Sequence, residues 1–192
     1  LILLTLPVIL SLQSMAMAND VNDYEIEGIS VGDSLLEHYT KKELKEAIEI
    51  YNYPASKEFI YYFLPKKNYD IYKYIQVHVD PEDKNFIIES IEGHISYKKN
   101  ISDCYKQMEK VEKELQKQLN INGINDEGKH PGDLSGNSKY KRVMFYFLNG
   151  DYVEVICYDM SEKEENKGYT DRFVVSLSTK KLLDFLTHRA YN

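Results

Sequence analysis

The chain has 192 residues, of which 29% are charged, and its formal net charge is −7 at neutral pH. That length suits one domain of ordinary size, or two small halves that share a core. The acidic balance argues against a nucleic-acid partner and against docking on anionic lipid, since both require a basic surface patch.

Residues 1–18 have the pattern of a secretory signal peptide. They carry no charge, and an apolar stretch over residues 1–12 precedes Ala16-Met17-Ala18, which matches a small-residue cleavage site. A membrane anchor needs about 20 apolar residues, so this stretch is too short to span a bilayer. We therefore expect cleavage after Ala18 and a single domain over residues 19–192, located in the periplasm or secreted, with no membrane span.

Residues 33–97 are expected to form helices followed by three strands. A short helix that ends at His38 comes first. Thr40 and Glu43 then have the spacing of a capping box, which predicts a second helix that Pro54 stops. This helix would carry four apolar residues on one face: Leu44, Ala47, Ile48 and Tyr51. The strands are expected at residues 58–64, 71–79 and 86–97.

Residues 100–177 are expected to repeat this order of elements. Asn100 or Ser102 caps a long helix with an apolar stripe at spacings of three and four. Residues 122–138 hold four glycines and one proline and are expected to form a loop. The stripe consists of Ile101, Cys104, Met108, Val111, Leu115 and Leu119. The strands are expected at residues 142–148, 151–159 and 172–177, before a C-terminal helix capped by Ser178 or Thr179.

The element order predicts an α+β domain in which helices pack on one face of a mostly antiparallel sheet, arranged as two αβββ halves. Asn149-Gly150 predicts a two-residue type I′ hairpin, because both turn positions of that type favour positive φ. In the expected register, Met144 lies opposite Val155 and Cys157 lies opposite Arg142.

The two cysteines of the chain, Cys104 and Cys157, are expected to form a disulfide. An even cysteine count in an exported chain favours a bridge. Cys104 lies on the apolar stripe of the long helix, and Cys157 shares a strand face with Val153 and Val155. Packing of that stripe on that face would bring the two together, in a bridge worth about 4 kcal/mol. The alternative is a pair of buried free thiols.

The histidines and glycines predict neither a metal site nor a cofactor. None of the five histidines occupies an H-x-x-x-H or H-E-x-x-H motif. In the expected hairpin, His94 lies opposite Asp70, about 27 Å from His78 at about 3.4 Å per residue. The glycine-rich segment at residues 132–138 lacks the Gly-Lys-Ser/Thr ending of a phosphate loop. A pair of acidic residues suited to hydrolysis needs only proximity in the fold, so the sequence leaves that chemistry open.

Tyrosine is the most informative residue type, with 17 copies and no tryptophan. By alternation, Tyr72, Tyr74, Gln76 and His78 share one face of the expected strand at residues 71–79. An amphipathic face of this kind suits the binding of an envelope protein or a sugar. The alternative is that tyrosine simply favours half-buried strand positions.

Several segments resemble uncharacterised exported proteins of marine alphaproteobacteria. They are residues 24–36, 101–106, 150–159, 168–171 and 175–179. The resemblance implies a Gram-negative periplasm and no particular activity. The run Gly28-Ile29-Ser30-Val31-Gly32-Asp33-Ser34, leading into a helix and three strands, is also similar to the small lipoproteins of the outer-membrane barrel-assembly machine, although the chain lacks their lipidated cysteine.

These features favour a non-enzymatic periplasmic binding or envelope-assembly module, with Tyr72, Tyr74, Gln76 and His78 as its binding surface. The alternative is a small periplasmic hydrolase with acidic catalytic residues. An enzyme should show a pocket with convergent carboxylates or histidines, whereas a binding module should show a flat or grooved aromatic face.

Overall fold

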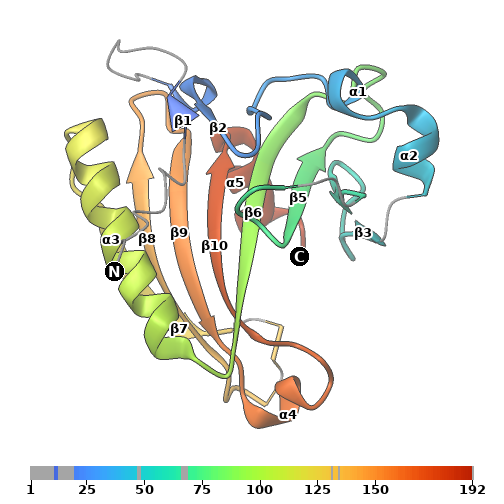
Figure 1. Cartoon of the computed structure of the whole chain (residues 1–192). Helices are drawn as coiled ribbons and strands as arrows, with labels where there is room; N and C mark the ends of the chain where they lie inside the picture. Colours follow the sequence, from blue (N-terminus) through green and yellow to red (C-terminus); the bar gives the residue numbers. More distant parts are fainter. Residues whose placement is uncertain are drawn as a thin grey trace.

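The computed structural model describes residues 11–12, 20–46, 49–65, 69–130, 132–133 and 135–191, and these residues form an α+β fold. Its centre is an antiparallel sheet of eight strands in the order β3-β4-β5-β6-β10-β9-β8-β7 (Figure 1). Two four-stranded meanders, β3 to β6 and β7 to β10, meet where β6 pairs with β10. The predicted α+β class is confirmed, and each half contributes four strands to the sheet.

The first half begins with a short segment outside the main sheet. Within the predicted signal peptide, β1 (Ser11–Leu12) pairs with β2 (Tyr24–Glu25); residues 1–10 and 13–18 lie outside the described residues. A 3₁₀ turn (Val21–Asp23), α1 (Leu35–His38) and α2 (Lys41–Lys45) follow. The strands of this half are β3 (Glu49–Asn52), β4 (Ile60–Phe63), β5 (Tyr74–Val79) and β6 (Ile88–Lys98).

The second half begins with α3 (Ile101–Leu119), which Asn100 caps as predicted. Its strands are β7 (Ile124–Lys129), β8 (Lys139–Tyr146), β9 (Tyr152–Asp159) and β10 (Asp171–Ser178). The short α4 (Glu162–Glu165) lies between β9 and β10, and α5 (Lys180–His188) ends the described chain with Thr179 as its N-cap.

The second predicted helix is much shorter than expected. The capping box of Thr40 and Glu43 is present, but α2 ends at Lys45, and residues 47–48 lie outside the described residues. Tyr51 belongs to β3, where its ring stacks on Tyr61 of β4 with centroids 4.8 Å apart. Cross-strand packing of this kind overrides the helical periodicity that the sequence shows.

The glycine-rich stretch at residues 122–138 is only partly a loop. Its first part forms β7, which pairs along its whole length with β8. A Cβ atom on Gly123 would overlap the Val143 side chain, and one on Gly128 would lie 3.0 Å from the Tyr140 hydroxyl. Two of the glycines that indicated a loop are therefore needed for close packing against β8.

The hairpin between β8 and β9 differs from the predicted two-residue turn. The Phe147 N–H donates to the Asp151 carbonyl at 2.8 Å, which leaves a three-residue loop at positions 148–150. Gly150 alone in this loop has positive φ, at 90°, so the loop is a turn followed by a left-handed glycine. The predicted register was wrong by one residue.

This shift changes which side chains face each other across the hairpin. Val143, in place of Met144, lies opposite Val155. Met144 is opposite Glu154, and Lys141, in place of Arg142, is opposite Cys157.

Helix α3 packs on one face of the sheet and is joined to it covalently. It contacts β6, β9 and β10 through a buried stripe of Cys104, Met108, Val111 and Leu115. Cys104 and Cys157 form a disulfide, with Cα atoms 6.0 Å apart, and both side chains are fully buried. The predicted bridge is confirmed, as is the strand face that Cys157 shares with Val153 and Val155.

The opposite face of the sheet, which we call the polar face, is partly covered by α5. Figure 1 shows α3 in front of the sheet and α5 behind it. Leu182 and Phe185 of α5 pack with Tyr53 and Phe59 in a second, smaller apolar cluster. None of the described helices is both long and apolar enough to cross a membrane.

Candidate functional site

The four residues predicted to share a binding surface do not all lie on one face. Tyr72 precedes β5, and its ring lies against the backbone of Gly93 in the core on the α3 side, where it is 4% exposed. Tyr74, Gln76 and His78 do lie together on the polar face, paired with His94, Glu92 and Ser90 of β6. Alternation fails for Tyr72 because the regular strand starts only at Tyr74.

His78 is buried, and its contacts are with other side chains of the protein interior. It is 2% exposed, and its Nε2 lies 2.8 Å from the Tyr53 hydroxyl, beside the apolar cluster of α5. Burial lowers the pKa of His78, which favours the neutral ring. Within the predicted set, Tyr74 and Gln76 therefore remain as candidates for contact with a ligand.

His94 lies closer to His78 than the expected hairpin register allowed. It is paired with Tyr74 rather than with Asp70, and its ring stacks on Tyr74 with centroids 4.4 Å apart. The difference arises because the connection between the strands is longer than expected, with Val79 paired to Ile88, and because a register irregularity beside Val79 adds one more residue. The described residues contain no group of three or more ligands that could hold a metal ion.

Two adjoining pockets form a groove on the polar face. The smaller, of about 170 Å³, lies beneath α5 and includes Glu92, Glu154 and Ser176 in its lining. The larger, of about 320 Å³, lies toward β7. Both are lined by Arg142, Ile156 and Tyr158, which makes them one continuous surface. The larger pocket is completed by Lys129 and Tyr140.

Glu154 is a buried acid at the floor of this groove. Burial raises its pKa to about 7, against the opposing effect of Arg142, whose Nη1 lies 3.0 Å from the carboxylate. Arg142 also binds Asp126 at 2.7 Å, so its charge is shared between two acids. Glu154 therefore gains and loses its proton near neutral pH.

The pKa of Glu92 is shifted in the opposite direction from that of Glu154, although both residues lie on the same face of the sheet. Burial opposes its charge, but the adjacent His94 side chain and the charge of Arg172 hold the pKa of Glu92 below its usual value. The Nε2 atom of His94 lies 3.3 Å from the Glu92 carboxylate. Glu92 and Glu154 lie on strands either side of β10, each paired with Ser176. The two acids thus face one groove with different protonation.

We expect the raised pKa of Glu154 to make stability depend on pH. An acid whose pKa is higher in the folded chain stabilises the fold fully below its unfolded pKa, and this contribution disappears as the pH rises through about 7. Glu154→Gln should therefore gain about 1–3 kcal/mol relative to the wild type between pH 5 and pH 8. Urea unfolding at both pH values measures this difference. An equal difference at the two pH values would show that folding leaves the titration of Glu154 unchanged.

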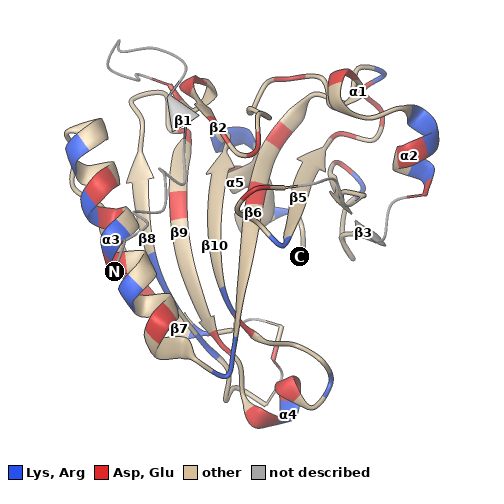
Figure 2. Cartoon of the chain, viewed as in Figure 1, with Lys and Arg blue, Asp and Glu red and all other residues tan. Residues whose placement is uncertain are grey.

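The charged residues of the sheet differ in placement from those of α3. Figure 2 shows acidic and basic residues alternating along α3, and acidic residues within β6 and β9. On α3 such charges cover the outer side of an amphipathic helix whose other side is buried. On β9, Glu154 is 8% exposed between Val153 and Val155, which are fully buried. A charge at such a position carries a desolvation cost, and this is typical of functional sites.

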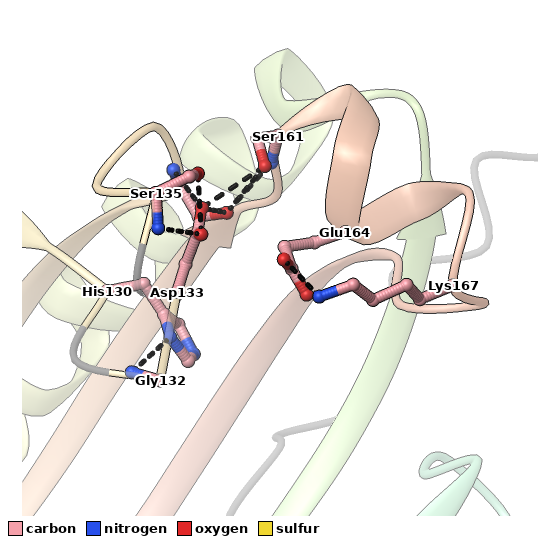
Figure 3. A network of polar contacts seen from close by, with 8 residues as sticks. His130, Gly132, Asp133, Ser135, Ser161, Glu164 and Lys167 are labelled. Atoms are coloured by element: carbon pink, nitrogen blue, oxygen red, sulfur yellow. Dashed lines mark hydrogen bonds and ion pairs between the residues drawn. The ribbon is translucent and has the colours of Figure 1, made fainter.

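A polar network near α4, which we call the rim, is drawn in Figure 3. Both carboxylate oxygens of Asp133 accept hydrogen bonds: Ser135 donates to one, and Ser138 and Ser161 donate to the other. Hydrogen bonds from Ser135 and Ser138 hold the pKa of Asp133 far below its usual value. Nearby, His130 lies edge-on to Tyr158 at 4.9 Å. The network therefore ties the loop before β8 to the start of α4.

The sequence interpretation did not identify Glu92, Glu154, Arg142 or Arg172 as site residues. The available signal was a lone charge inside a strand whose neighbours are apolar, as in Val153-Glu154-Val155. That signal marks single positions, whereas the groove depends on the strand order β6-β10-β9, which joins the two halves.

Comparison with known proteins gives no relative: no family model matches the chain, and neither a curated protein nor a solved structure matches it.

Proposed function

We propose that this protein is a non-enzymatic binding module of the periplasm that holds a small polar ligand, such as a sugar, in the groove of its polar face. The observation that carries the proposal is the groove itself, in which tyrosines lie beside partly buried charged groups. Tyrosine rings offer apolar faces with a polar edge, and charged groups in a partly desolvated site form strong directional contacts.

The dimensions of the groove favour a small ligand over an envelope protein. Its pockets, of about 170 and 320 Å³, lie at or below the lower end of the range for small-molecule sites, roughly 300–1,000 Å³. A hollow of this kind accepts one or two sugar-sized units, whereas protein partners generally bury broad surfaces.

The buried disulfide supports the proposed compartment. Cys104 and Cys157 are joined in the core, and such bridges persist in oxidising surroundings such as the periplasm. The signal-peptide pattern of residues 1–18 points to the same location.

A hydrolase is the second candidate, because Glu92 and Glu154 face one groove with opposite pKa shifts. A protonated acid and an ionised acid on the same face are the pair that glycoside hydrolysis uses. Binding is favoured over hydrolysis because Glu154 is already engaged by Arg142 at 3.0 Å, which leaves it less free to donate a proton.

Ligand-observed NMR with a panel of sugars, amino acids and short peptides tests the binding function. We expect one class to bind the wild type and to bind at least about tenfold more weakly to Tyr140→Ala, because losing a stacked ring costs on the order of 1 kcal/mol or more. Tyr169→Ala, which removes a 52% exposed ring near α4, is the matched control and should bind as the wild type does.

Two results would contradict this proposal. Equal binding by Tyr140→Ala and the wild type would place the ligand outside the groove. Conversion of the bound ligand to products, abolished in Glu154→Gln, would identify the protein as the hydrolase instead.

A further inference from the structure

Arg172 is a cation on the polar face that makes no direct ion pair among the described residues, although its charge lowers the pKa of Glu92 from a greater distance. The chain contains three arginines. Arg142 binds Asp126 and Glu154, and Arg189 has an ion pair of its own. Within the described ranges, no carboxylate oxygen lies within 4 Å of a side-chain nitrogen of Arg172.

The contacts that Arg172 does make leave its hydrogen-bonding capacity largely unused. Its guanidinium carbon lies 4.5 Å from the ring centroid of Tyr158, and its Nη1 lies 4.0 Å from the sulfur of Met160. Its Nε is buried and has no hydrogen-bond partner among the residues that the structure describes. A partly buried guanidinium without an acceptor is costly, which is the situation that a bound anion would relieve.

Two other cationic side chains lie near the ring on which Arg172 stacks. Tyr158, on which Arg172 stacks, lines the larger pocket together with Lys129 and Arg142. His130 lies edge-on to the same ring, and its pKa is lowered by burial and then by the charge of Arg172, which favours the neutral ring. Lys129, Arg142 and Arg172 are thus the cations around Tyr158 that could attract an anion.

Asp133, the acid of the rim, already has hydrogen bonds to both of its carboxylate oxygens. Asp133 accepts hydrogen bonds from the three serines described above and is held in the loop before β8 (Figure 3). Its hydrogen bonds are therefore made within the rim, and Arg172 is left without a directly bound counter-ion in the part of the chain that the structure describes.

We propose that Arg172 binds the anionic group of a small ligand, a carboxylate or a phosphate, at the edge of the groove, where Arg172 stacks on the lining residue Tyr158. The proposal rests on the binding function inferred above and specifies the class of ligand. The planar guanidinium presents paired N–H donors that match both kinds of anion, and the Tyr158 ring fixes the guanidinium plane. The remainder of the ligand would lie over Tyr158 and Tyr140, toward the second pocket.

Thermal unfolding with inorganic phosphate or sodium acetate tests this assignment, with sodium chloride of equal ionic strength as the reference. At about ten times its Kd, a bound anion should raise the Tm of the wild type by about 3–6 °C. Arg172→Met should lose this rise. Arg189→Met, which removes an arginine of the C-terminal segment, should keep it, since Arg189 already has an acidic partner in Glu58.

Arg172→Lys retains the charge but not the fork of donors, so we expect at least tenfold weaker anion binding than in the wild type. In NMR spectra of the wild type, the Nε–H signal of Arg172 should shift when the effective anion is added. A rise with phosphate alone indicates a phosphorylated ligand, a rise with acetate alone indicates a carboxylate, and either result supports the assignment.

Failure of this assignment is distinguishable from failure of the binding function. If the ligand panel binds the groove but neither anion stabilises the wild type, or if Arg172→Met responds as the wild type does, Arg172 is not an anion site and the binding function stands. If neither the panel nor the anions bind, both proposals are wrong.

Discussion

Replacing both Cys104 and Cys157 with alanine is expected to lower the free energy of unfolding by about 4 kcal/mol. The two residues are 53 positions apart, and opening a loop of that length returns considerable entropy to the unfolded chain. Because both side chains are fully buried, the double substitution also leaves a small cavity between α3 and β9. Equilibrium urea unfolding of the two proteins measures the loss.

A reducing agent provides the control for this experiment. Dithiothreitol should destabilise the wild type by a similar amount and should leave the alanine variant unchanged, because only the wild type has a bridge to reduce. A variant as stable as the wild type would contradict the expectation and would show that the apolar stripe of α3 suffices to hold it on the sheet.

Adding one methyl group at Gly93 is expected to lower the free energy of unfolding by about 2–3 kcal/mol. A Cβ atom there would lie 2.5 Å from the ring carbons of Tyr72, which is closer than side chains tolerate. The ring is 4% exposed and is enclosed by the core on the α3 side, so it has little room to move. Thermal and urea unfolding of Gly93→Ala measure the effect.

The clash itself is isolated by a double-mutant cycle with Tyr72→Ala. Tyr72→Ala alone should cost about 3–5 kcal/mol, because it empties a large core position. In the double variant the added methyl group no longer meets the ring. The loss of unfolding free energy in the double variant should therefore be smaller, by about 1–3 kcal/mol, than the sum of the losses in the two single variants. Strict additivity would locate the effect of Gly93→Ala elsewhere, for instance in the strand backbone.

Local signals in the sequence were sufficient to predict the elements that have a clear helix cap or a regular pattern of apolar residues. Helix α3 begins at its predicted cap, Asn100, and its stripe carries Cys104 to the sheet. Once that face was known, the alternation of β9 located Cys157 correctly on it. These predictions succeeded because each depends on residues within about one or two turns, or one strand, of each other.

The errors arose where distant partners decide the local structure. Neither edge strand of the sheet, β3 or β7, has an alternating apolar pattern, and each is defined mainly by its single neighbour. Tyr72 was assigned to the wrong face because alternation was extended past the point where β5 begins. The hairpin register depended on one extra residue in the loop before Asp151. That residue shifts the partner of every β9 residue by one position along β8.

The groove could not be predicted from local sequence patterns, for a related reason. Glu92, Ser176 and Glu154 come from three strands, and two of these belong to one half of the chain while the third belongs to the other. Their convergence requires β10 to insert beside β6, a pairing with about 80 residues between its partners. Sequence patterns give no information about such a long-range choice when each half could equally form a sheet of its own.

The central position of β10 also has a consequence for how the protein is made. A ribosome synthesises this strand after the other seven, yet β10 lies between β6 and β9. Until it emerges, both meanders must present an unpaired edge, and such edges invite pairing with other chains. Nascent or truncated chains that stop before Asp171 should therefore be vulnerable to aggregation, and a holding chaperone during synthesis would protect the β6 and β9 edges in particular.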